Sequence, residues 1–132
     1  MNITADTNIL VRAITGDDPV QSRIAERLLT EAKLVALPDA ALCELCWVLA
    51  RVYRFGTAEI AHVIRTLMSA ENVAVEQQRV NAGLAILEAG GDFADGIVAH
   101  SGQWLGGETF VSFDQKAVAL LKKQGVKVML PQ

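Results

Sequence analysis

Four acidic side chains stand at separate places along the chain, next to segments that should be buried. Asp6 and Asp114 each follow a predicted β-strand, and Glu44 and Asp95 each lie in a predicted apolar helix. Carboxylates that share one site repel one another unless a cation lies between them. Oxygen ligands favour Mg²⁺ or Mn²⁺, and such an ion can activate water and offset charge on phosphorus. If the four acids converge, they are suited to phosphodiester hydrolysis.

Each of these acids also has a purely structural explanation. Asp6 and Asp114 could each act as the N-cap of the helix that follows, which is a common role of Asp. Glu44 shares a helix face with Ala41 and Val48, where a carboxylate is costly unless it is paired, binds a metal or reaches solvent. These structural roles stay open until the side chains can be located.

Asp92 and Asp95 stand three residues apart at the start of a predicted helix. Their spacing is that of an acidic capping box, with Asp92 as the better candidate for the N-cap. Asp95 then lies one turn into the helix, ahead of the apolar run at residues 97–99. Like Glu44, it is an acid that leads into a helix expected to be buried.

The elements that must position these acids alternate along the chain. Short strands separated by helices need crossover connections, so the pattern predicts parallel strands. We expect an α/β fold of three layers, α/β/α, around a central, mainly parallel five-stranded sheet. Ligands of such sheets bind beyond the carboxyl ends of the strands, where Asp6 and Asp114 stand. The predicted strands span residues 2–5, 34–37, 72–75, 109–113 and 126–130, and the predicted helices 8–14, 19–32, 39–52, 57–70, 77–89, 92–105 and 115–124.

Length and composition limit the classes of protein. The 132 residues suit one domain over 1–132, and 52% hydrophobic with 20% charged residues excludes intrinsic disorder. The net charge of −3 argues against a protein that coats duplex DNA by bulk positive charge. No apolar segment is long enough to span a membrane, and no secretory signal is visible. We therefore expect a cytoplasmic protein.

The spacing of Cys43 and Cys46, three residues apart, invites a zinc or redox interpretation. The pair lies inside a predicted helix, and the chain has no second cysteine pair. Buried structural cysteines are therefore the better interpretation.

Taken in order, the sequence resembles PIN-domain ribonucleases, most closely the VapC-type toxins of bacterial toxin–antitoxin pairs. The resemblance covers essentially the whole chain. Its four motifs are specific when taken together, although a single motif is not. It rests on the segments Asp6-Thr7-Asn8-Ile9-Leu10, Glu44 in a helix, Asp92-Phe93-Ala94-Asp95-Gly96-Ile97-Val98-Ala99 and Ser112-Phe113-Asp114. Gly96 stands where Ala is commoner in the family, and Ser112 where Thr is commoner.

The resemblance implies a Mg²⁺- or Mn²⁺-dependent endoribonuclease. Asp6, Glu44, Asp95 and Asp114 would be the catalytic acids, and Asp6, Asp95 and Asp114 would hold the metal. Supporting roles fall to Asn8, Thr7 and Ser112, while Asp92 stays open as a ligand, a support for a ligand or a helix cap. Arg12 and Lys116 are candidate phosphate contacts. The excess of acidic residues is no larger than this proposed site.

The resemblance also implies partners: an RNA substrate, a cognate VapB-like antitoxin and a second copy of the chain in a homodimer. A mean hydropathy of +0.30 is high for a small monomer, which agrees with a covered apolar surface. Two alternatives stay open, namely a PIN-like nuclease of RNA processing and a catalytically silent interaction module. A phosphoacceptor receiver or an aspartyl phosphatase fits poorly, because Asn8 stands where the phosphatase needs its second Asp.

Overall fold

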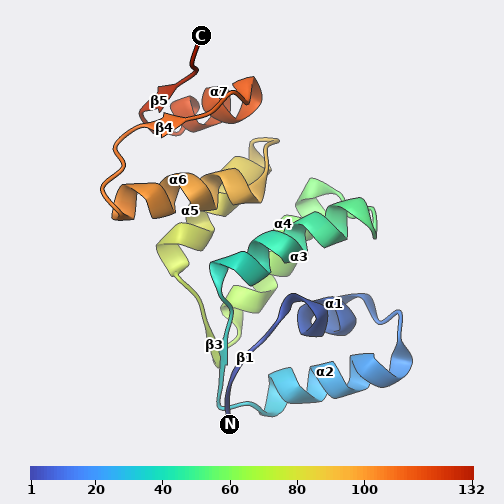
Figure 1. Ribbon diagram of the computed structural model, residues 1–132. Coiled ribbons are helices and arrows are strands. Elements are labelled where there is room, and N and C mark those ends of the chain that lie inside the picture. Colours follow the sequence, from blue (N-terminus) through green and yellow to red (C-terminus); the bar gives the residue numbers. More distant parts are fainter. The chain divides into compact units, whose positions relative to one another are not determined.

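The computed structural model describes residues 1–132, which form two compact units, Met1–Glu76 and Gln77–Gln132 (Figure 1). Both units alternate helices with short parallel strands. The first unit contains β1 (Asn2–Thr4), α1 (Thr7–Thr15), α2 (Pro19–Glu31), β2 (Leu34–Ala36), α3 (Asp39–Arg51), α4 (Thr57–Ser69) and β3 (Val73–Ala74). The second contains α5 (Gln77–Glu88), α6 (Phe93–Trp104), β4 (Phe110–Val111), α7 (Gln115–Lys123) and β5 (Val128–Met129).

The sheet of the first unit has the order β1-β2-β3, with all strands parallel. Ile3 pairs with Val35, which pairs in turn with Val73. Helices α1 and α2 connect β1 to β2, and α3 and α4 connect β2 to β3. Because the strands are parallel, the chain leaves β1 and β2 at the same edge of the sheet. The N-termini of α1 and α3 therefore lie at one edge, which is where Asp6 stands.

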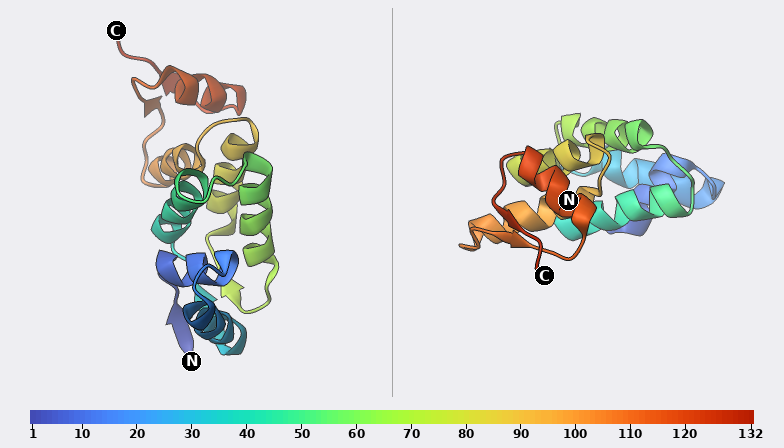
Figure 2. Two further views of the ribbon diagram at one scale, coloured as in Figure 1. Left: turned by 90° about the vertical axis from the view of Figure 1, so that its right-hand side faces the viewer. Right: turned by 90° about the horizontal axis from the view of Figure 1, so that it is seen from above.

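Helix α1 organises the packing of the first unit, because it contacts both α2 and α3. The left view of Figure 2 shows α1 and α2 side by side. Leu10 of α1 and Leu42, Leu45 and Leu49 of α3 are fully buried. Burial of such side chains supplies most of the stability of short helices, which are marginal in isolation.

The second unit is built on the close pair α5 and α6. Its strands β4 and β5 are parallel, with Phe110 opposite Val128. A core of Ile86, Ala99 and Leu121 joins α5, α6 and α7. The elements that carry Asp92, Asp95 and Asp114 thus pack within one unit.

The structure confirms the predicted α/β class and the parallel pairing, but the single five-stranded sheet is wrong. The strands form a sheet of three in the first unit and a sheet of two in the second. Strand signals in a sequence identify strands without fixing which of them pair, and each of these strands is only two or three residues long. The three-layer arrangement and the single domain over 1–132 stay predictions.

Helix boundaries agree with the sequence pattern to within about two residues. Asp39 is the first residue of α3, after Pro38, and α4 begins after Gly56. The carboxylate of Glu59 accepts a hydrogen bond from the Gly56 N–H at 2.9 Å, which satisfies one unpaired donor at that end. None of the helices combines the length and the apolar character needed to cross a bilayer.

Candidate acidic site

Asp6 caps the helix that follows the first strand. It is exposed, and its carboxylate accepts a hydrogen bond from the Thr7 N–H at 2.9 Å. Asp6 therefore acts as the N-cap of α1, which is the structural role considered for it above. One carboxylate oxygen makes this bond, so the other remains accessible to a ligand.

Thr7 is buried, with 4% of its surface exposed. Its hydroxyl donates to the carbonyl oxygen of Ala41 in α3 at 3.2 Å. This bond ties the first turn of α1 to the first turn of α3, the helix that carries Glu44. Thr7 therefore links the first turns of α1 and α3, and its buried side chain is not open to solvent.

Glu44 and Asn8 are both exposed. The sequence pattern suggested an apolar setting for Glu44, and in the structure its side chain instead reaches solvent at the edge of the buried stripe of α3. Solvent removes the desolvation cost expected for a carboxylate among apolar residues. Glu44 is therefore accessible, and burial gives no argument for its pairing.

In the second unit, the charges of two acids act on a third. The pKa of Asp95 is raised above its ordinary value, chiefly by burial and then by the negative charges of Asp92 and Asp114. Like charges close together disfavour ionisation, and a cation among them reverses that effect. The structure thus brings Asp92, Asp95 and Asp114 into one negative region.

Asp92 occupies the N-cap position of α6, but its side chain makes no capping hydrogen bond. Its backbone carbonyl accepts the N–H of Asp95 at 3.0 Å. The carboxylate is exposed and is not used by the helix end. Of the three roles left open for Asp92, that of a side-chain cap is the one the structure does not support.

Asp114 caps α7, because its carboxylate accepts from the Ala117 N–H at 3.0 Å. The Ser112 hydroxyl oxygen accepts the Asp114 N–H, also at 3.0 Å. Ser112 therefore fixes the turn that leads from β4 to Asp114. The capping role and the predicted functional role of Asp114 coexist, since capping occupies only one carboxylate oxygen.

The two units divide the predicted acids between them. Asp6 and Glu44 belong to the first unit, and Asp92, Asp95 and Asp114 belong to the second. No group of three acidic, histidine or cysteine side chains is close enough to hold one metal ion. The donor chemistry nevertheless fits a hard cation, because Asp95 lies in a region of negative charge and the Asp92 carboxylate is not bound by the helix end.

The candidate phosphate contacts differ in their surroundings. Lys116 is exposed in the first turn of α7, two residues after Asp114. Arg12 is held instead by two neighbours: its Nε donates to Gln21 at 2.7 Å, and its Nη1 lies 3.2 Å from an Asp17 carboxylate oxygen. Gln21 could not be identified from the sequence, because no motif links it to Arg12 nine residues earlier.

The cysteines behave as structural residues. Both thiols are free, and Cys46 is buried while Cys43 is half-buried. Burial raises the pKa of Cys43 to about 11 and that of Cys46 to about 12. Thiols held in the protonated form are poor nucleophiles and poor metal ligands.

The family model described as PIN domain matches residues 3–123, a range that includes all four predicted catalytic acids. No curated protein matches the chain.

Proposed function

The chain belongs to the PIN domain family, whose members are typically metal-dependent nucleases, and on that premise we propose that it is an endoribonuclease acting as the toxin of a toxin–antitoxin pair. Its cofactor is Mg²⁺ or Mn²⁺. It hydrolyses phosphodiester bonds of RNA with an activated water molecule.

One observation carries this proposal: the pKa of Asp95 is raised, first by burial and then by the negative charges of Asp92 and Asp114. A folded chain has no structural need for a half-buried acid with two negative neighbours, and perturbed acids of this kind are typical of functional sites. Lys116 follows Asp114 on the same helix and supplies a positive charge for a phosphate group.

In this proposal Asp6, Asp95 and Asp114 would hold the cation, directly or through water. A divalent cation bound there would lower the pKa of a water molecule and offset the charge that develops on phosphorus. Glu44 would complete the set of acids or orient the attacking water. Asn8 supports this site with an exposed amide, Thr7 and Ser112 keep the acids in position, and Asp92 adds negative charge next to Asp95.

The toxin role rests on the resemblance to VapC-type proteins across the whole chain. It implies a VapB-like antitoxin that keeps the enzyme inactive, a homodimer, and action in the cytoplasm. The exposed apolar side chains fit a chain that is covered by protein partners, since 79% of Trp104 and 86% of Leu105 are exposed. A PIN nuclease that processes RNA would share the same chemistry without the antitoxin.

Expression in a bacterial host tests the toxin role. We expect the wild-type chain to arrest growth, the Asp6→Asn variant to permit it, and the product of the adjacent open reading frame to rescue the wild type. Asparagine also caps helices well, so Asp6→Asn should still fold, and restored growth would reflect lost activity rather than lost folding. Unimpaired growth at good soluble expression of the wild type would contradict the toxin role and leave the RNA-processing role.

A further inference from the structure

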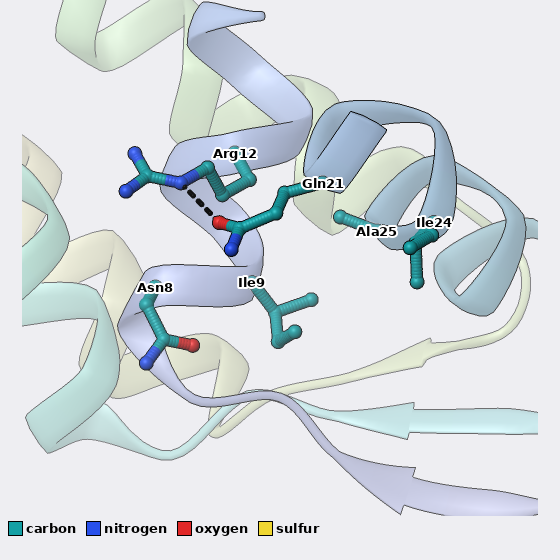
Figure 3. A pocket seen from close by; sticks show the side chains of 6 residues that line it. All are labelled: Asn8, Ile9, Arg12, Gln21, Ile24 and Ala25. Atoms are coloured by element: carbon teal, nitrogen blue, oxygen red, sulfur yellow. Dashed lines mark hydrogen bonds between the residues drawn. The ribbon is translucent and has the colours of Figure 1, made fainter. Parts of the chain in front are cut away.

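A pocket of about 380 Å³ lies between α1 and α2 of the first unit (Figure 3). Its volume is in the range of small-ligand sites. Asn8, on the first turn of α1, lies two residues beyond Asp6 and lines the pocket. The full lining is Asn8, Ile9, Arg12, Gln21, Ile24 and Ala25.

Arg12 is fixed in this pocket and its charge is balanced. Its Nη1 lies 3.2 Å from Asp17, which also accepts hydrogen bonds from the Tyr53 hydroxyl at 2.6 Å and the Thr15 hydroxyl at 3.0 Å. These two hydrogen bonds, followed by the charge of Arg12, lower the pKa of Asp17 and keep it ionised. The pocket therefore has little net charge, which favours a neutral ligand group over a phosphate.

The orientation of Gln21 follows from that of Arg12. A guanidinium group has only donors, so Gln21 turns its oxygen to Arg12 Nε, at 2.7 Å, and its NH₂ group away from it. In Figure 3 this nitrogen points to the side of Asn8 and Ile9. The polar wall of the pocket thus offers hydrogen-bond donors, and Ile9, Ile24 and Ala25 form an apolar wall.

We propose that this pocket binds a base of the RNA strand next to the cleaved bond, and that it prefers guanine. Guanine has the acceptor O6 where adenine has an amino donor, so the NH₂ group of Gln21 can donate to guanine and not to adenine at that position. The flat face of guanine fits the apolar wall, and bases of single-stranded RNA are free to turn into such pockets. The inference rests on the proposed ribonuclease function, because only an RNA strand held at Asp6 brings a base here.

Two RNA oligonucleotides that differ in one base test this inference. One carries a single guanine in an otherwise guanine-free sequence, and the other has adenine at that position. The measured quantity is the ratio of kcat/KM for cleavage beside that position, with Mg²⁺ present. We expect the wild type to favour guanine by about tenfold or more, as the loss of one hydrogen bond does when it leaves a group unpaired.

Gln21→Glu is the decisive variant, because a carboxylate still accepts from Arg12 but replaces the NH₂ donor with an oxygen. We expect its guanine-to-adenine ratio to fall towards one. Thr30→Glu adds the same charge to an exposed position of α2 outside the pocket and should keep the wild-type ratio. Circular dichroism spectra of both variants should match that of the wild type, which checks that they are folded.

The outcomes separate this inference from the proposed function. A wild type that cleaves RNA with no base preference, or a Gln21→Glu variant with an unchanged ratio, overturns the base pocket and leaves the ribonuclease in place. A wild type that cleaves neither oligonucleotide overturns the proposed function, and the base pocket with it.

Discussion

Gly96 of α6 packs so closely on α5 that a β-carbon added to it would lie 2.7 Å from the Cα of Gly83. It would also meet the carbonyl oxygen of Ala82. Because Gly96 directly follows Asp95, the close approach of the two helices fixes the part of the backbone that carries this acid. The presence of Gly where the family more often has Ala thus has a packing explanation.

Gly96→Ala should therefore destabilise the protein. The added methyl group meets backbone atoms of α5, which cannot move aside as a flexible side chain would. We expect the free energy of unfolding to fall by about 1–3 kcal/mol, measured by urea denaturation. Gly102→Ala is the matched control in the same helix, because nothing lies within 4 Å of its added carbon. It should be neutral or stabilising by up to about 1 kcal/mol, and an equal loss in both variants would contradict the packing explanation.

Thr7→Val tests the link between α1 and α3. Valine keeps the volume of threonine but removes the buried hydroxyl that donates to Ala41. We expect the free energy of unfolding to fall by about 0.5–1.5 kcal/mol in urea denaturation, the usual net contribution of one hydrogen bond. Thr7→Ser keeps the hydroxyl and should keep this part of the stability, apart from the loss of a methyl group. A Val variant as stable as the wild type would show that the bond contributes nothing.

Substitutions of Asp114 separate its structural role from its catalytic one. Asparagine caps helices about as well as aspartate, so Asp114→Asn should keep the wild-type melting temperature and lose metal-dependent RNA cleavage. Asp114→Ala removes the bond to Ala117 as well and should cost about 1 kcal/mol of stability in addition. Full cleavage by the Asn variant would mean that Asp114 only caps α7.

The lowered pKa of Asp17 predicts an acid-dependent loss of stability. A depressed pKa in the folded state stabilises the fold above the unfolded value of about 3.9, and this contribution is lost as the pH falls through the folded value. Asp17→Asn should therefore be less stable than the wild type at pH 7, and the difference should vanish near pH 2. Melting temperatures followed by circular dichroism measure this.

Tyr53→Phe tests the same effect on Asp17 in a second way. It removes the hydroxyl that contributes most to lowering the pKa of Asp17. Like Asp17→Asn, it should make the stability of the protein less dependent on pH in the acidic range. A difference between the wild type and the Asn variant that is constant from pH 7 to pH 2 would contradict the explanation.

Much of the local structure was predictable from the sequence. The Asp18-Pro19 start of α2 combines a capping carboxylate with a residue suited to the first turn, and both are observed there. The pairing of strands was not predictable, since strands of two or three residues carry too little pattern to name their neighbours. The contacts of Arg12 with Asp17 and Gln21 depend on how α1 packs on α2, which no local motif encodes.

The candidate site was likewise predictable from the sequence only in part. The positions of Asp6 and Asp114 after strands followed from strand ends alone. The negative region around Asp95 could not be derived from the sequence, because it needs α6 and α7 to pack in one unit. The exposure of Glu44 differs from the sequence expectation because the buried face of α3 is made by neighbours such as Leu42 and Leu45.

The central claim is that Asp6 and Asp95 are both required for metal-dependent cleavage of RNA. Cleavage of a labelled single-stranded RNA by Asp6→Asn, Asp95→Asn and the double variant, with Mg²⁺ or with EDTA, tests it most directly. The account predicts cleavage by the wild type that EDTA abolishes, a loss of about 100-fold or more in each single variant, and no further loss in the double variant, because groups that act together are not additive. Full metal-dependent cleavage by either single variant, or wild-type cleavage that persists in EDTA, would contradict it.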